Sequence, residues 1–134
     1  MNKKQIRWQQ RFNNYSNSFG ALKRALEIEK PNEAEKGGII QFYEVTFELA
    51  WKTLKDYLEA EGYSIKSPRE TLKQAFQNEI FTEGELWLDA LEDRNLTTHI
   101  YDETTANKVI DKIRNRYFKL LEELFSFFTE KVNQ

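Results

Sequence analysis

The chain has 134 residues, a formal net charge of -2 and a pI near 5.6. Its length fits one domain with a substantial core, and its charge argues against a protein that coats nucleic acid through bulk positive charge, while leaving room for a small local cationic site. The absence of cysteine excludes disulfides and thiolate metal sites. Because we also find no signal-peptide pattern and no membrane-spanning run, we expect a cytoplasmic protein without a membrane partner.

The first expected helix carries apolar residues at alternating spacings of three and four, which place them on a single helix face. These residues are Trp8, Phe12, Tyr15, Phe19, Leu22 and Leu26. We expect this helix to end near Lys30, because Pro31 disfavours helical geometry at the residue before it.

The second expected helix runs from Ile39 to about Ala60 and is the most apolar segment of the chain. Its apolar residues spread over more than one face, which is typical of a central helix packed by several neighbours. The Gly37-Gly38 pair before it indicates a second loose point in the chain. Gly62 lies where a left-handed C-terminal cap is expected.

The third expected helix starts at Ser67, because Ser67, Pro68 and Glu70 supply an N-cap, a first-turn proline and a capping-box glutamate in that order. The pattern breaks around 81–82. A short fourth helix is then predicted over 83–91.

The last expected helix begins after Asp102, which is available as its N-cap, and carries a long apolar stripe. The stripe comprises Ala106, Val109, Ile110, Ile113, Tyr117, Leu120, Leu121, Leu124 and Phe128. No strand pattern competes anywhere in the chain. We therefore predict an all-α fold, an antiparallel up-and-down bundle of four to five helices forming a single domain over 1–134.

Several kinds of chemistry are absent from the sequence. There is no phosphate-binding glycine loop and no dinucleotide fingerprint. The chain also lacks the Asp-x-Asp pair and the Gly-Ser turn that a nucleotidyltransferase uses to hold two metal ions, so we expect it not to transfer nucleotides itself. With one histidine and no cysteine, we predict no metal and no cofactor.

The stretch from Arg94 to Tyr101, expected to link the fourth helix to the last, is the candidate for chemistry. His99 is the only side chain whose ordinary pKa allows proton transfer near neutrality. Arg94 lies five residues upstream, and its guanidinium is suited to holding a phosphate through two parallel hydrogen bonds. Neutral donors and acceptors for a phosphodiester or nucleotide are Asn95, Thr97, Thr98 and Tyr101.

A purely structural interpretation stands beside this one. A lone histidine near a helix start often caps or packs, and Arg94 has Glu92, Asp93 and Asp102 as possible ion-pair partners. The three tryptophans, Trp8, Trp51 and Trp87, fall on or beside apolar stripes, so we favour core packing over a base-stacking platform. The cationic group Lys66, Arg69 and Lys73 is more typical of a solvated surface.

The pattern of Arg94, four residues, His99, one residue and Tyr101 resembles the signature of HEPN-domain proteins, particularly toxin-like members paired with minimal nucleotidyltransferases. The blocks 47–54, 67–70 and 93–95 are similar to the nucleotidyltransferase substrate-binding protein family, kin to the helical domain of kanamycin nucleotidyltransferase. The sequence departs from the usual family pattern at Asn78-Glu79-Ile80, where a glycine is common.

This resemblance implies a homodimer in which Arg94 and His99 of both subunits line one cleft, with a separate minimal nucleotidyltransferase as partner. In HEPN ribonucleases the two residues act on RNA without metal, so the resemblance implies that His99 assists the attack of the 2′-hydroxyl while Arg94 stabilises the developing charge. It also implies adenylylation of Tyr101 by the partner, which would block the cleft. Asn95 and Thr98 would contact the substrate.

Two alternatives remain open at this point. The chain could be a non-catalytic substrate-binding module that completes the active site of the partner nucleotidyltransferase, with His99 merely contacting a ligand. It could also be a helical adaptor with no active site, for which its balanced surface charge and ordinary core stripes would be sufficient.

Overall fold

The computed structural model of the chain describes residues 2–99 and 102–134, apart from the side chain of His99. Every regular element in these residues is a helix, so the predicted all-α bundle is confirmed. None of the described helices is long and apolar enough to cross a membrane.

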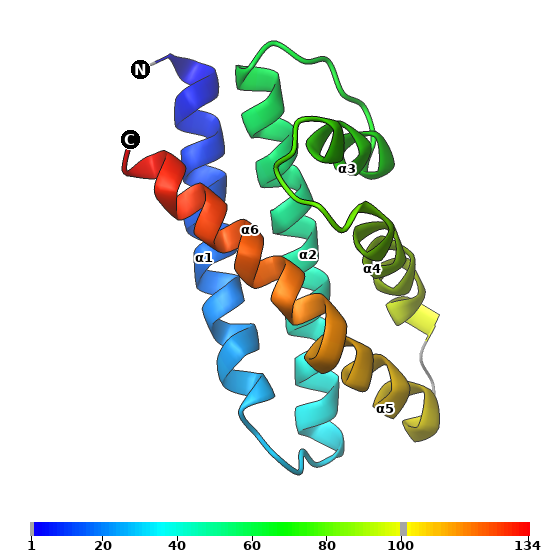
Figure 1. Cartoon of the computed structure of the whole chain (residues 1–134). Helices are drawn as coiled ribbons and strands as arrows, with labels where there is room; N and C mark the ends of the chain where they lie inside the picture. Colours follow the sequence, from blue (N-terminus) through cyan, green and yellow to red (C-terminus); the bar gives the residue numbers. More distant parts are fainter. Residues whose placement is uncertain (1, 100–101) are drawn as a thin grey trace.

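Helices α1 (Lys3–Leu26) and α2 (Glu33–Ala60) form a long antiparallel hairpin on which the other helices pack (Figure 1). The first helix begins earlier than predicted, because the side chain of Asn2 caps it by accepting from the amide of Gln5 at 2.9 Å. It also ends at Leu26, before the expected boundary at Lys30. Its predicted apolar stripe from Trp8 to Leu22 is buried.

Helix α2 starts before the predicted boundary at Ile39. Asn32 and Glu35 form a capping box, with reciprocal side chain to backbone distances of 2.8 and 2.9 Å. The helix therefore already has a stable start when it reaches Gly37-Gly38, and the loose point predicted at these glycines is wrong. At the other end Gly62, with φ of 103°, provides the predicted left-handed cap.

Helices α3 (Pro68–Gln77) and α4 (Gly84–Leu96) are short and pack beside α2. Ser67 is the N-cap of α3, as predicted, and accepts from the amide of Glu70 at 3.1 Å. The carboxylate of Glu70 accepts from the amide of Lys66 rather than from that of Ser67, so the predicted capping box is incomplete.

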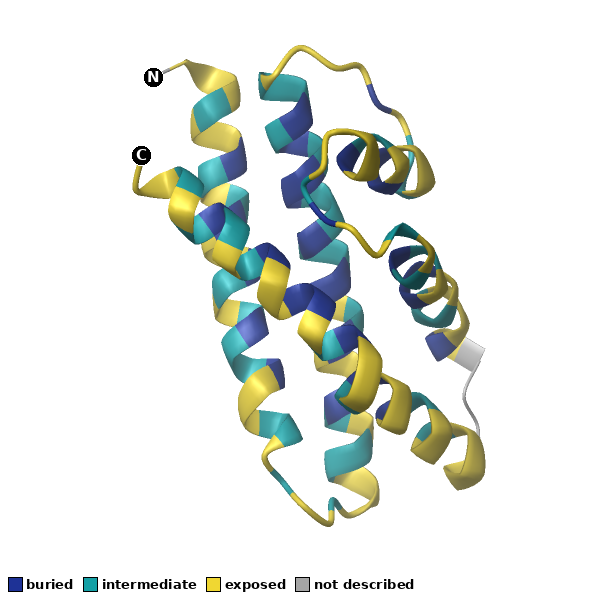
Figure 2. Ribbon diagram, viewed as in Figure 1, coloured by how far each residue is buried: buried dark blue, intermediate teal, exposed yellow. Residues whose placement is uncertain are grey.

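The last predicted helix is a rod in three parts: α5 (Glu103–Lys112), a π-helical segment (Ile113–Tyr117) and α6 (Phe118–Val132). Asp102 caps its start as predicted, accepting from the amide of Thr105 at 2.7 Å. The rod crosses the α1–α2 hairpin obliquely in Figure 1 and turns its buried stripe toward it (Figure 2). The π-helical segment was not predicted.

The core is rich in aromatic rings. Trp8 and Trp87 are 2% and 1% exposed, which confirms their predicted packing role. Trp51 is only partly buried and donates its indole N–H to Glu48 at 3.0 Å. Two buried phenols donate to backbone carbonyls, Tyr15 to Leu121 at 2.5 Å and Tyr43 to Ala90 at 2.7 Å. These hydroxyls are therefore satisfied inside the bundle.

Candidate functional site

The stretch predicted as a linker is largely helical. Arg94 and Asn95 lie in the last turn of α4, which continues to Leu96, and Thr97–His99 form a 3₁₀ helix directly after it. The hydroxyl of Thr97 donates to the carbonyl of Arg94 at 2.6 Å and satisfies an acceptor that the helix end leaves free. The backbone from Arg94 to His99 is therefore a helix end followed by a 3₁₀ helix, and not an irregular loop.

Two predicted roles fall outside what the structure describes. The side chain of His99 and all of Tyr101 lie outside the described residues. The proximity of His99 to Arg94 in space and the accessibility of Tyr101 therefore stay predictions. Asn95 and Thr98, the other predicted contacts, are both exposed to solvent.

Arg94 pairs with a residue far away in the sequence. Its Nη2 lies 3.0 Å from Oε2 of Glu48 on α2, and the side chain remains 30% exposed. Its Nη1 lies 3.5 Å from the side-chain oxygen of Asn95, and its Nε is buried without a hydrogen-bond partner. The structural alternative, an ion pair of Arg94 with Glu92, Asp93 or Asp102, is not observed among the described residues, because the last turn of α4 packs the guanidinium against α2.

Glu48 receives three donors and is the centre of this part of the site. Besides Arg94, it accepts from the indole N–H of Trp51 at 3.0 Å and pairs with the ammonium of Lys52 at 3.2 Å. Partial burial acts to raise the pKa of Glu48, but these two hydrogen bonds and the charge of Arg94 outweigh it and hold the pKa below its ordinary value. Glu48 is therefore an anion that fixes the guanidinium of Arg94.

A shallow hollow opens beside this ion pair. We call it the Arg94 hollow; it measures about 260 Å³ and is lined by Glu44, Val45, Glu48, Leu49 and Arg94. It adjoins a second hollow of about 450 Å³, the α1–α2 groove, lined by Asn14, Asn17, Ser18, Ala21, Gln41, Phe42, Val45 and Leu49. The guanidinium is thus reached from a face that also exposes apolar side chains.

Asp93, the residue before Arg94, points to a different neighbour. Its carboxylate accepts from the phenol of Tyr117 and lies 3.4 Å from the ammonium of Lys112. Burial raises the pKa of Tyr117 well above its ordinary value, and the hydrogen bond to Asp93 and the charge of Asp93 raise it further. The phenol is therefore a hydrogen-bond donor across the physiological range of pH.

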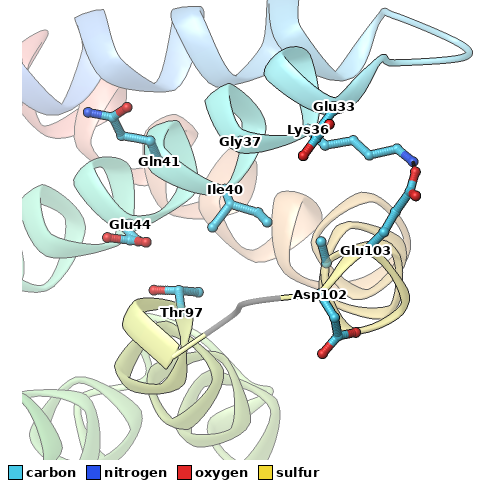
Figure 3. A pocket seen from close by; sticks show the side chains of 10 residues that line it. Glu33, Lys36, Gly37, Ile40, Gln41, Glu44, Thr97, Asp102 and Glu103 are labelled. Atoms are coloured by element: carbon cyan, nitrogen blue, oxygen red, sulfur yellow. Dashed lines mark hydrogen bonds and ion pairs between the residues drawn. The ribbon is translucent and has the colours of Figure 1, made fainter.

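The acidic hollow lies between α2, Thr97 and the start of α5 (Figure 3). It measures about 270 Å³, and its lining residues are Glu33, Lys36, Gly37, Ile40, Gln41, Glu44, Thr97, Asp102, Glu103 and Ala106. Its one ammonium, on Lys36, already lies 2.8 Å from the carboxylate of Glu103. Four carboxylates around one paired cation disfavour a phosphate here.

Three members of the site, Glu48, Trp51 and Lys52, were not predicted from the sequence. A signal was available, since all three stand in the block 47–54 that carries part of the family resemblance. Their spacing of three and four residues places them on one helix face. What the spacing does not reveal is that α4 brings Arg94 to this face.

The remaining predicted features are simpler. Lys66, Arg69 and Lys73 are exposed on or just before α3, as expected of a solvated surface. Among the described residues, no group of three or more aspartate, glutamate or histidine residues could hold a metal ion. The described part of the site contains a guanidinium fixed by the carboxylate of Glu48, with the exposed polar side chains of Asn95 and Thr98 nearby in the sequence.

Comparisons with known proteins identify a family and a similar fold. Residues 10–130 match the family model described as nucleotidyltransferase substrate binding protein like. A crystal structure of a protein from Thermus thermophilus is similar, with 31% sequence identity and a TM-score of 0.78 over 84% of this chain and 96% of that one. A search of curated proteins gives no match.

Proposed function

Because the chain belongs to the nucleotidyltransferase substrate-binding-like family, we propose that it is the helical subunit of a pair whose catalytic chain is a separate minimal nucleotidyltransferase. We propose further that this subunit is a metal-independent endoribonuclease, the toxin of a toxin–antitoxin pair. The observation that carries the second step is the guanidinium of Arg94, which Glu48 holds at 3.0 Å while 30% of the side chain stays exposed.

The proposed chemistry needs one acid–base group and one cation. His99 removes the proton from a 2′-hydroxyl of RNA, and the 2′-oxygen attacks the adjacent phosphorus. The bond to the 5′-oxygen of the next nucleotide breaks and that oxygen takes up a proton from water, leaving a 2′,3′-cyclic phosphate and a 5′-hydroxyl. Arg94 stabilises the negative charge on the phosphoryl oxygens in the transition state. Asn95 and Thr98 contribute neutral hydrogen bonds to the substrate.

We propose that the chain acts as a homodimer through the face that carries the α1–α2 groove. Phe42 and Val45 on this face are 40% and 45% exposed, and Val45 also lines the Arg94 hollow. Exposed apolar side chains surrounded by neutral polar ones are typical of protein interfaces. A second copy on this face would bring two Arg94 guanidinium groups to one cleft.

Regulation by the partner is proposed at Tyr101. In this scheme the phenol oxygen of Tyr101 attacks the α-phosphorus of a nucleoside triphosphate held by the nucleotidyltransferase, and pyrophosphate leaves. The nucleotide then attached to Tyr101 carries negative charge and bulk close in sequence to Arg94 and His99. Modified protein would therefore bind RNA less well than the unmodified protein.

A second candidate function is a non-catalytic module that completes the substrate pocket of the nucleotidyltransferase. One observation favours it: Glu48 already neutralises Arg94, so the guanidinium is less available to a phosphate than an unpaired one would be. In this function the Arg94 hollow contacts the substrate of the partner, and RNA is not cut.

The deciding experiment compares wild type with His99→Ala in an assay of RNA cleavage, using the purified full-length chain. We expect wild type to release cyclic-phosphate ends, and His99→Ala to lose at least about 100-fold in rate, as removal of an acid–base group commonly does. Arg69→Ala, which removes an exposed cation on α3, is the control and should cleave normally.

Two outcomes reject the ribonuclease proposal. The first is full cleavage by a folded His99→Ala variant. The second is a wild-type chain that cuts no RNA but raises the transfer rate of the partner nucleotidyltransferase, which supports the binding module instead. Circular dichroism of each variant establishes that the helical bundle is intact.

A further inference from the structure

We propose that Tyr117 is a positioning residue, which acts through Asp93 to fix the helix end that presents Arg94. This inference rests on the proposed function only for its catalytic consequence, because its structural part concerns the described residues alone. It assigns a purpose to the π-helical segment, which neither the fold nor the proposed chemistry has used.

Two neighbouring residues at the end of α4, Asp93 and Arg94, are held from two different sides. Consecutive side chains on an α-helix diverge by about 100° around the helix axis. Arg94 accordingly meets Glu48 on α2, while Asp93 meets Tyr117 and Lys112 on the last rod. The last turn of α4 is therefore bonded to two different elements, and its rotation about its own axis is restricted.

The π-helical segment delivers the phenol to this point. Tyr117 is its last residue, 2% exposed, and its ring stacks on that of Tyr43 with centroids 5.8 Å apart. Tyr43 in turn donates to the carbonyl of Ala90, one turn before Asp93. Two stacked phenols thus hold successive turns of α4. Single π-helical turns are rare and occur frequently at functional sites.

The contact with Asp93 is directional as well as attractive. The carboxylate is 16% exposed, so it needs protein donors to replace water, and Tyr117 and Lys112 supply them. Without the phenol, only the longer contact of 3.4 Å with Lys112 remains. Because the Nε of Arg94 is buried without a partner, the guanidinium depends on Glu48, Asn95 and its own backbone for its position. Loosening that backbone therefore loosens the guanidinium.

The test is Tyr117→Phe, which keeps the ring and removes only the hydroxyl. The matched control is Tyr15→Phe, which removes another buried hydroxyl. That hydroxyl donates a hydrogen bond to the carbonyl of Leu121 in the α1–α6 contact. Both variants should lower Tm by a few degrees. Only Tyr117→Phe should speed hydrogen exchange of the amides of residues 94–98, by about tenfold, because only it loosens the end of α4.

A catalytic readout completes the test. With RNA as substrate, Tyr117→Phe should lower kcat about tenfold and change KM less than twofold, since a misplaced group weakens the transition state more than substrate binding. Tyr15→Phe should leave both constants unchanged. If the wild-type chain cuts no RNA, the proposed ribonuclease fails, and the exchange measurement still decides the positioning role.

Equal exchange at residues 94–98 in the two variants would overturn the proposal, because the hydroxyl would then matter only for general stability. A double-mutant cycle with Asp93→Ala, which removes the acceptor altogether, gives an independent check. The two changes should be non-additive in their effect on exchange, since each removes the same hydrogen bond. Additive effects would show that Tyr117 does not act through Asp93.

Discussion

The contact between α1 and α6 and the end of α4 are built in opposite ways. In the first, the ring of Phe128 lies between 5.3 and 5.6 Å from the rings of Trp8, Phe12, Tyr57 and Phe127, and it is fully buried. In the second, charged and hydroxyl groups fix partly exposed side chains. Ring packing supplies free energy with little directional demand, whereas ion pairs and hydrogen bonds set orientation at a smaller net gain.

Because of this difference, we expect substitutions in the aromatic core to affect mainly stability, and substitutions at the end of α4 to affect mainly the candidate site. Removing apolar volume from the α1–α6 contact should lower the free energy of unfolding without changing the contacts of the candidate site in the folded protein. Removing a polar partner at the α4 end should disturb the site and cost less stability. The largest losses of stability are therefore expected in the aromatic core, and the smallest at the exposed ion pairs.

Phe128→Ala should lower the free energy of unfolding by about 3–5 kcal/mol, because it leaves a cavity among four aromatic neighbours. Urea denaturation followed by circular dichroism measures this. Val132→Ala on the same helix is the control, since Val132 is 41% exposed and its loss should cost less than about 0.5 kcal/mol. A loss below about 1 kcal/mol for Phe128→Ala would contradict the assigned role of the aromatic core.

Arg114→Met should cost about 1–2 kcal/mol, since the guanidinium of Arg114 donates to the carbonyls of Leu26 and Ile28 at the end of α1. Thermal unfolding provides the measurement. Arg116→Met, an exposed position in the same π-helical segment, should have little effect. Equal losses of thermal stability in Arg114→Met and Arg116→Met would show that the contacts of Arg114 with the carbonyls do not stabilise the fold.

Glu48→Gln should produce a smaller, pH-dependent effect of about 1 kcal/mol or less, because the ion pair is partly exposed and screened. The folded pKa of Glu48 is lowered, so its stabilisation is fully present above the unfolded value of about 4.3 and is lost as the pH falls through the folded pKa. Unfolding of wild type and Glu48→Gln should be measured at pH 7, 5 and 3.5. The difference between their free energies of unfolding should become smaller as the pH falls. A difference that grows on acidification would contradict this.

Local sequence signals predicted much of the fold. The predicted apolar stripes are buried from Trp8 to Leu22 and from Ile110 to Phe128, whereas Leu26, Ala106 and Val109 are only partly buried. The caps at Ser67, Gly62 and Asp102 lie where the sequence predicts them. Each of these features depends on residues within one or two helical turns. Their spacing alone therefore carries the necessary information.

The errors have physical causes that spacing does not reveal. The start of α2 was misplaced because the Asn32–Glu35 capping box lies upstream of two glycines, which suggested a break. The π-helical segment was missed because Ile113 and Tyr117, four residues apart, also fit an ordinary helix stripe.

At the candidate site, residue type singled out Arg94 and His99, but not the partners of Arg94. Glu48 reaches Arg94 because α4 packs beside α2, and Asp93 accepts from Tyr117, which lies in the π-helical segment of the last rod. Contacts between distant segments depend on tertiary packing. A single sequence contains no direct record of them.

The two glycines at the start of α2 have a consequence for local unfolding. Among the described residues outside the local helix backbone, a methyl group placed on Gly37 or Gly38 would meet no atom within 4 Å, so packing against these residues does not require glycine at either position. Each costs the helix roughly 0.5–1 kcal/mol relative to alanine. The adjacent Lys36 is tied to Glu103 at the start of α5. Local unfolding of the first turns of α2 would break the ion pair between Lys36 and Glu103 and remove the α2 side of the acidic hollow. The aromatic contact at the far end of the hairpin would stay folded.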